Sequence, residues 1–203
     1  MENNTTKMNA DLLAWNDDNA LDDASKFILN GGIIIYPTDT LYGFGVDATN
    51  RNAINNLNLL KKREQMYSII LHSISDIDNF AFINQNQLDY IKKILPGPYT
   101  VILKSKKSSL SKLVNMNSGT IGIRIPKSNF ILDVVKKINK PIVTTSVNIN
   151  GQKSIENVIE MEKVFPKINI FKEDLATNSY GSTIIDLTKN DPKILRKGDG
   201  EIV

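Results

Sequence analysis

Residues 31–45 read GGIIIYPTDTLYGFG, and this stretch gives the strongest indication of the fold. Its first half is a short β-branched run between glycines and Pro37, which is typical of an internal strand in a covered sheet. The second half, Tyr36 to Gly45, is rich in hydroxyl groups and punctuated by glycine. Such a loop directly after a buried strand is where α/β folds place ligands. The alternative is a plain turn whose Thr and Asp side chains satisfy local backbone groups.

Helical and strand patterns alternate on both sides of this stretch. Upstream, a helix is expected from Asp17, ending at Asn30-Gly31-Gly32. Downstream, the pattern predicts helices over residues 51–62, 85–95, 129–138 and 155–164, and strands over 68–72, 99–104, 120–125, 142–145, 168–171, 183–187 and 194–196. This alternation predicts an α/β fold with a mixed, twisted sheet, and the two closely spaced final strands predict an antiparallel portion.

The length and the first residues suggest a simple domain organisation. At 203 residues the chain can bury one substantial core, and nothing in its composition requires two. Residues 1–16 are polar and lack sustained periodicity, so we expect a loosely packed leader there and a single domain over residues 17–203. The N-terminus has no secretory signal pattern and no apolar run approaches a membrane span, which predicts a cytoplasmic protein without membrane contact.

Composition excludes several kinds of chemistry. The chain has no Cys, which rules out disulfides, thiolate metal sites and a cysteine nucleophile. His72 is the single histidine, so a zinc site built from several His is also excluded. A strained Gly-x-Ser-x-Gly turn for a serine nucleophile is absent. The net charge of +3 permits contact with polyanions but falls short of a nucleic-acid signature, so hydrolases and nucleic-acid binders are both disfavoured.

Two further segments could carry chemistry. Lys61-Lys62-Arg63 ends a predicted helix; it either complements the negative helix C-terminus or clamps phosphate oxygens, for which Arg offers a planar fork. Residues 144–148, Thr-Thr-Ser-Val-Asn, place polar groups at the end of an apolar strand. Buried polar groups need partners, and a ligand could supply them. His72 ends its own strand in a similar way, although a lone His is more often structural.

Seven strings along the chain resemble one known family, the YrdC/TsaC family of threonylcarbamoyl-AMP synthases, in their order. They are Tyr36 to Gly45, Lys61-x-Arg63 followed by His72, Pro96 to Thr100, Gly122 to Pro126, Ser146-x-Asn148, Ser182 to Asp186, and Leu195-Arg196-x-Gly198. The resemblance covers the chain from about Asp17 to its C-terminus, and seven motifs in order are far more specific than any one of them.

The resemblance implies both a fold and a reaction. The fold would be an open α/β structure whose twisted, mixed sheet, flanked by helices, curves around a large basic cavity. The reaction would join L-threonine, bicarbonate and ATP into threonylcarbamoyl-AMP and pyrophosphate, with Mg²⁺ on the phosphates, for N6-threonylcarbamoyladenosine modification of tRNA. The partners implied are these substrates, with tRNA and the downstream transferase proteins as transient ones. Positioning and electrostatics suffice for such chemistry, so the absence of a covalent nucleophile fits.

The resemblance also implies site residues at the matching positions, without any side chain that ligates a metal. It assigns catalysis to Lys61, Arg63, Ser146 and Asn148. It assigns ATP binding to Lys61, Arg63, Tyr67, Thr120, Asn148 and Arg196. It assigns threonine binding to Thr38, Thr40, His72, Arg124, Ser146 and Ser182, with Arg124 paired to the threonine carboxylate in a bidentate way.

Two segments depart from the family pattern. After Arg63 the family usually has Pro, and Asn-Pro or Lys-Pro before the strand, whereas this chain has Glu-Gln-Met-Tyr-Ser over residues 64–68. After Gly151 this chain has Gln-Lys-Ser-Ile-Glu, so Glu156 stands where family members commonly have a hydroxyl residue near the nucleotide. With Val203 as the last residue of the sequence, the resemblance implies the short, single-domain form of the family.

Three other functions remain open on the sequence. A YciO-like paralogue shares the fold and several motifs but tends to lose the Ser-x-Asn pattern that Ser146 and Asn148 retain here. An RNA-binding module of the same fold would need aromatic-interleaved basic stretches, which are lacking. The carbamoyl-adenylate domain of hydrogenase maturation normally sits in a much longer chain with a zinc-finger region.

Overall fold

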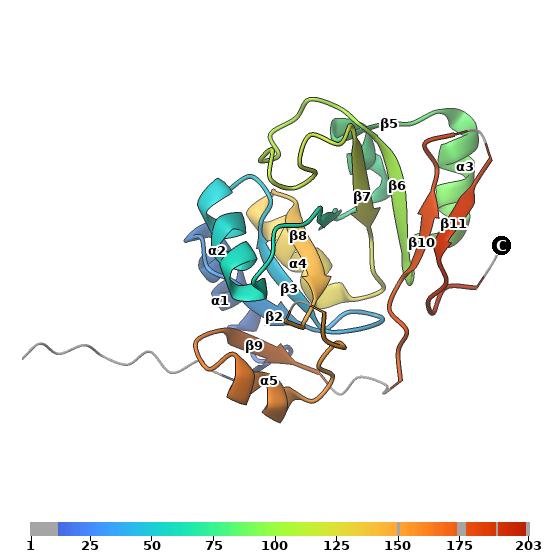
Figure 1. Ribbon diagram of the computed structural model, residues 1–203. Coiled ribbons are helices and arrows are strands. Elements are labelled where there is room, and N and C mark those ends of the chain that lie inside the picture. Colours follow the sequence, from blue (N-terminus) through green and yellow to red (C-terminus); the bar gives the residue numbers. More distant parts are fainter. Residues whose placement is uncertain (1–11, 150, 174–177, 190, 202–203) are drawn as a thin grey trace, which may run out of the picture.

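The computed structural model describes residues 12–149, 151–173, 178–189 and 191–201 (Figure 1). The helices are α1 Ala20–Leu29, α2 Arg51–Lys61, α3 Gln85–Ile94, α4 Asn129–Ile138, α5 Val158–Val164 and the 3-10 helix η1 Ile74–Asn79. The strands are β1 Leu12–Ala14, β2 Ile34–Tyr36, β3 Gly43–Asp47, β4 Ser68–Ile70, β5 Ala81–Phe82, β6 Tyr99–Ser105, β7 Thr120–Arg124, β8 Ile142–Ser146, β9 Asn169–Lys172, β10 Thr183–Asp186 and β11 Lys193–Arg196.

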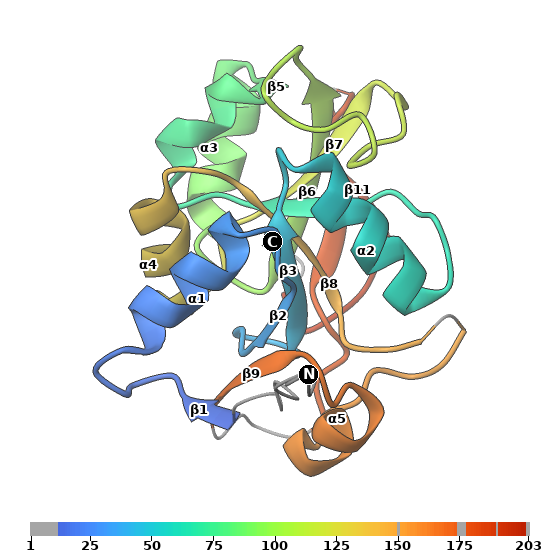
Figure 2. The ribbon, with the colours of Figure 1, turned by 90° about the vertical axis from the view of Figure 1, so that its left-hand side faces the viewer.

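All of these strands join one sheet. Their order is β1-β9-β2-β3-β8-β4-β7-β6-β10-β11, and β5 pairs with β6. The pairs β1–β9, β2–β9, β4–β7 and β6–β10 are parallel, whereas the others are antiparallel, including the expected β10–β11 pair. The sheet is twisted and has helices on its sides (Figures 1 and 2). The predicted α/β fold with a mixed sheet is therefore confirmed.

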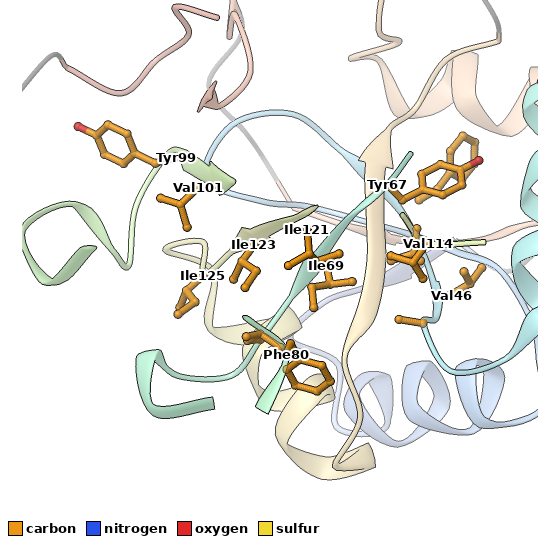
Figure 3. Packing of buried hydrophobic residues seen from close by; sticks show 14 of the residues in the cluster. Val46, Tyr67, Ile69, Phe80, Tyr99, Val101, Val114, Ile121, Ile123 and Ile125 are labelled. Atoms are coloured by element: carbon orange, nitrogen blue, oxygen red, sulfur yellow. The ribbon is translucent and has the colours of Figure 1, made fainter. Parts of the chain in front are cut away.

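Successive residues of the central strands pack into different layers, because side chains alternate across a strand. Ile69 and Val143 belong to a large core that also contains residues of α2, α3 and α5. Their neighbours Ile70 and Ile142 belong to a second core with residues of α1 and α4. Figure 3 shows part of the larger core, with Ile69, Ile121 and Ile123 close together, and Figure 2 shows α1 and α4 on one side of the sheet.

Strand β3 is the main element that the sequence pattern does not predict, since the pattern indicates a loop over the whole stretch from Tyr36 to Gly45. The loop is shorter, and Gly43–Asp47 pairs antiparallel with both β2 and β8. A Cβ at Gly45 would lie 2.7 Å from Cε1 of Tyr36, so the glycine makes room for this aromatic ring on the neighbouring strand. Glycine weakens a strand in isolation, and here the ring of the partner strand covers it.

Two other differences lie at element ends. The helix expected from residue 155 begins at Val158, because the side chain of Asn157 accepts a hydrogen bond from the backbone N–H of Glu160 and caps it there. Strand β1 pairs parallel with β9, so the sheet begins within the stretch that sequence analysis treats as a leader. Residues 1–11 of that leader lie outside the described residues. Within the described part of the chain, no helix has the length and apolar character needed to cross a membrane.

Candidate functional site

A cavity of about 440 Å³ opens on the sheet, within the roughly 300–1,000 Å³ range of small-molecule sites. Ser68, Arg124 and Thr144 line it. Ser68 and Thr144 are each two positions from an isoleucine that packs under α1 and α4, so they lie on the same face of the sheet. On the part of this face that lines the cavity, hydroxyl and guanidinium groups take the place of the isoleucines that pack against α1 and α4.

The floor of the cavity depends on pairing between three strands. Ser68 on β4 lies opposite Thr144 on β8 and beside Gly122 on β7. A Cβ on Gly122 would come within 2.5 Å of the Ser68 Oγ, so the glycine leaves room for this hydroxyl. Thr144 also accepts a hydrogen bond from the buried Tyr36 hydroxyl at 2.7 Å, which links the cavity to the packed core.

Arg124 is held at one wall by the loop before β3. Its Nη2 donates to Asp39 Oδ1 and to Thr40 Oγ1, both at 3.1 Å. Its Nε is buried and has no hydrogen-bond partner among the described residues. A buried unpaired donor is unfavourable by about 1–3 kcal/mol. The guanidinium is thus fixed through Nη2, and it lines the cavity.

The loop itself combines the two interpretations that the sequence left open. Asp39 Oδ2 accepts from the backbone N–H of Lys127, and Thr38 Oγ1 donates to the carbonyl of Leu41 at 2.7 Å, as a structural turn would. Thr40, in contrast, lines the cavity. Thr38 lines a neighbouring cavity of about 490 Å³ and contacts Thr40 Oγ1 at 3.1 Å. Thr38 thus supports the residue that faces the ligand space.

A second guanidinium, that of Arg196, comes from β11, the strand at one end of the sheet. Arg196 donates through Nε and Nη2 to the carbonyl of Ser182, at 3.1 and 2.7 Å, and its Nη2 also reaches the Ser182 hydroxyl. That hydroxyl lies 2.8 Å from Thr100 Oγ1. Burial first, and the positive charge of Arg124 second, lower the pKa of Arg196, while Asp199 opposes them. An anion between the two guanidiniums would relieve this repulsion.

The third arginine, Arg63, lines the cavity from the segment after α2. In the same segment Gln65 donates through Nε2 to Thr145 Oγ1 at 3.2 Å, which joins this segment to β8. Tyr67 lines the cavity too, but its hydroxyl donates to Asn58 Oδ1 at 2.7 Å. Burial raises the pKa of Tyr67 to about 12, so the phenol stays neutral near pH 7.

Lys61 lies behind the cavity and does not line it. The side chain is fully buried, and its Nζ donates to the carbonyls of Ser146 and Asn148 and to Asn148 Oδ1, at 2.7, 3.2 and 2.6 Å. These contacts use all three ammonium donors and fix the turn after β8. Burial, followed by the positive charge of Arg63, lowers the pKa of Lys61 to about 7.

The charge of the cavity is one-sided. Arg63, Arg124 and Arg196 line it, and the described lining residues include no Asp or Glu. Asp39, which is largely buried, forms an ion pair with Arg124. In a site of low dielectric constant, such an arrangement favours ligands that carry several negative charges.

The structure brings together most of the residues that the sequence predicted. Those that line the cavity are Thr40, Arg63, Tyr67, Arg124, Ser146, Ser182 and Arg196. Lys61, Asn148 and Thr38 support these residues from behind. Thr120 does not line the cavity, and its hydroxyl contacts Ser118 at 3.2 Å.

His72, which the resemblance groups with the threonine-binding residues, does not line this cavity. It lines a different cavity of about 390 Å³, together with Asp76 and Lys136. Its Nδ1 lies 3.2 Å from the carbonyl of Leu132. Strand β4 ends at Ile70, two residues before His72, so the residue lies past the end of the strand on which the prediction placed it.

Several lining residues had no individual role in the sequence-based prediction. Thr100 and Thr144 fall within quoted motifs, and alternation along their strands would have identified them once the buried face was known. Met66 and Tyr180 carried no sequence signal, because isolated apolar side chains are normal on protein surfaces. Ser68 also had none, since only strand pairing brings it beside Gly122.

Two curated relatives align with most of this chain. A protein of Methanocaldococcus jannaschii, whose name provisionally assigns it to the threonylcarbamoyl-AMP synthases, is 38% identical over 183 residues, which cover 87% of this chain and 84% of the relative. The threonylcarbamoyl-AMP synthase of Psychromonas ingrahamii is 32% identical over 150 residues, which cover 71% of this chain and 78% of the relative.

Two solved structures share the fold. Sua5 of P. abyssi, solved in complex with L-threonine, superimposes with a TM-score of 0.82 at 26% identity over 90% of this chain. The matched part is 55% of that Sua5 chain, so this chain spans about half of its length. YciO of E. coli also gives a TM-score of 0.82, at 23% identity, covering 91% of this chain and 92% of YciO.

A family model settles the relationship. The Sua5/YciO/YrdC model, described as Telomere recombination, matches residues 26–198, which include the strands that form the cavity and all three of its arginines. The match extends over far more than half of the chain and agrees with both the relatives and the fold. This chain therefore belongs to the Sua5/YciO/YrdC family.

Proposed function

We propose that this protein is a threonylcarbamoyl-AMP synthase, which makes threonylcarbamoyl-AMP and pyrophosphate from L-threonine, bicarbonate and ATP. The observation that carries the proposal is the cavity itself, with three arginines and no carboxylate among its described lining residues. Each of the three substrates is an anion or carries a carboxylate. The names of the two relatives and the threonine complex of Sua5 support the same activity.

The reaction needs two steps, and neither uses a covalent enzyme intermediate. The amine of threonine combines with bicarbonate to give a carbamate and water. A carbamate oxygen then attacks the α-phosphorus of ATP, and pyrophosphate leaves. Negative charge accumulates on the phosphate oxygens during this displacement, so fixed cations in a site that excludes water stabilise the transition state.

The residues divide between the two ends of the reaction. Arg124 would bind the threonine carboxylate, because it lines the cavity and Asp39 and Thr40 hold its Nη2 in place. Arg63 and Arg196 would bind phosphate oxygens on either side. Ser146 would contact the amino acid, and Lys61 would act by fixing the turn that carries Ser146.

Mg²⁺ fits this site as a companion of the nucleotide. The cavity lining offers it no carboxylate, and the described residues contain no group of three or more His, Cys, Asp or Glu that could hold a metal. Its ligands would therefore be triphosphate oxygens and water, and the ion would reduce the charge on the leaving pyrophosphate. The proposal extends to use of the product for tRNA modification by transferase proteins, and the cytoplasmic location stays a prediction.

The test is pyrophosphate release by the purified protein from ATP with Mg²⁺ and bicarbonate, comparing L-threonine with L-serine and with no amino acid. We expect release that requires both threonine and bicarbonate. Folded protein that releases no pyrophosphate under these conditions would contradict the proposal. It would instead favour a YciO-like role, which the fold alone does not separate, since both solved structures superimpose with the same TM-score.

A further inference from the structure

The rim of the arginine cavity carries two large apolar side chains that the proposed reaction does not yet use. Tyr180 lies just before β10 and is 81% exposed, and Met66 lies between α2 and β4 and is 59% exposed. Both line the cavity, whose other described walls are mostly hydroxyl and guanidinium groups. Exposure alone does not single out Tyr180, because exposed apolar side chains are common. Its place in the lining of a polar, cationic cavity does.

The backbone that carries Tyr180 is held firmly. Its N–H donates to Asp199 Oδ1 at 2.8 Å, and the hydroxyl of Ser179 donates to the other oxygen of the same carboxylate. The N–H of Asp199 donates back to the carbonyl of Gly181 at 2.8 Å. Gly181 has a φ of +78°, a conformation that favours glycine and that sets the direction of this turn. The exposed ring is therefore presented on an ordered turn.

The arginines and the apolar side chains of the cavity lining favour one orientation of a bound nucleotide. Its phosphates belong with the arginines, which leaves the base to the large apolar side chains of the lining. A purine has two wide, flat π-faces, and stacking on an aromatic side chain contributes about 1–3 kcal/mol per base. Methionine adds a polarizable, adaptable contact that suits a flat ring.

We propose that Tyr180 and Met66, which both line the cavity, form the surface on which the purine base of the nucleotide stacks. This inference rests on the proposed function, since it assigns the base-binding part of the same site. Stacking area rather than hydrogen bonding would then set the nucleotide preference, so purine nucleotides bind better than pyrimidine nucleotides. The same contact would hold the adenine of the product until it is released.

Direct binding tests this inference without turnover. Calorimetric titration of the wild type and of Tyr180→Ala with ATP, CTP and inorganic tripolyphosphate compares a purine, a pyrimidine and no base at all. We expect Tyr180→Ala to weaken ATP binding about tenfold, to reduce the preference for ATP over CTP, and to leave tripolyphosphate binding unchanged. Tyr180→Phe should bind ATP like the wild type, because it keeps the ring, and Met66→Ala should weaken ATP binding about threefold.

Phe82→Ala is the matched control, since Phe82 is also a large aromatic side chain, 59% exposed, but does not line the cavity. It should leave ATP binding unchanged. Normal ATP binding by Tyr180→Ala, or an equal loss for tripolyphosphate, would overturn the inference while the proposed function stands. A wild-type protein that binds none of the three ligands would overturn both.

Discussion

Two halves of one sheet face behave in opposite ways. The half under α1 and α4 carries Ile70, Ile142 and other fully buried apolar side chains. The half beyond those helices carries Ser68, Thr144 and Arg124 and opens into the cavity. The same strands contribute to both, with a spacing of two residues between isoleucine and hydroxyl. One sheet face can therefore be apolar in one part and polar in another. The kind of side chain at each position depends on whether a helix or the cavity lies over that position.

The packed half should respond to lost volume. Ile142→Ala removes a fully buried side chain between the sheet and α4, so we expect a loss of about 2–5 kcal/mol in the free energy of unfolding. Chemical denaturation measures this. Ile142→Val should lose only about 0.5–1.5 kcal/mol. The KM values for ATP and threonine should not change in the folded variant, and a selective rise in either would show that the two halves are coupled.

The open half should respond to lost geometry at constant charge. Arg124→Lys keeps a cation next to Asp39 but removes the planar fork, so we expect kcat/KM for threonine to fall about 100-fold, while ATP binding stays near normal. Threonine-dependent pyrophosphate release measures this. Lys127→Ala, which changes an exposed side chain nearby, is the control. A variant that uses threonine normally would remove Arg124 from the threonine site.

The border between the halves is the hydrogen bond from Tyr36 to Thr144. Thr144→Val leaves the buried Tyr36 hydroxyl without this acceptor, so we expect a loss of about 1–3 kcal/mol in the free energy of unfolding. The double variant Tyr36→Phe with Thr144→Val removes both partners and should recover most of that loss. A double-mutant cycle on unfolding free energies measures the difference, and additive losses would mean that the bond contributes nothing to stability.

The buried cation behind the cavity predicts a pH dependence. The pKa of Lys61 is about 7 in the folded protein and 10.5 as its ordinary value, so the unfolded chain keeps the proton at higher pH than the folded one. Stability should therefore rise from pH 7 toward pH 10 by up to about 1.4 kcal/mol per pH unit from this group.

Lys61→Met removes this contribution, and the difference in unfolding free energy between wild type and variant isolates it from other titrations. We expect that difference to grow in favour of the wild type as the pH rises. A flat difference would mean that the carbonyls of Ser146 and Asn148 and the Asn148 amide oxygen hold Lys61 charged throughout this range.

Most elements of the fold could be predicted from local pattern. Helix α4 matches its predicted bounds, because five apolar residues recur on one face, and Asn139 ends it in a left-handed conformation. Strand β3 could not be predicted, since its Gly43 and Gly45 are poor strand formers and only the ring of Tyr36 on the next strand explains them. The start of α5 could not be predicted either. The spacing of apolar residues indicates a helix from residue 155, whereas the Asn157 side chain caps the helix and makes it begin at Val158.

The candidate site divides in the same way. Arg63, Arg124 and Arg196 stand in recognisable motifs, and the structure brings all three to one cavity. Lys61 stands in a motif as well, but it is buried behind the cavity, where its Nζ donates to the carbonyl of Ser146. His72 lines a different cavity from these residues. A motif gives the order of residues along the chain but not the face on which a side chain emerges after its strand has ended.

By itself, the sequence determined the α/β alternation, the order of the motifs and the residue types that an anionic ligand needs. These follow from local rules, because periodicity and residue chemistry are properties of neighbours along the chain. Tertiary structure alone decided that Thr144 lies beside Ser68 and that Tyr180 meets the arginine cavity. Such contacts join residues far apart in the chain, and they exist only after strand register has fixed which side chains share a face.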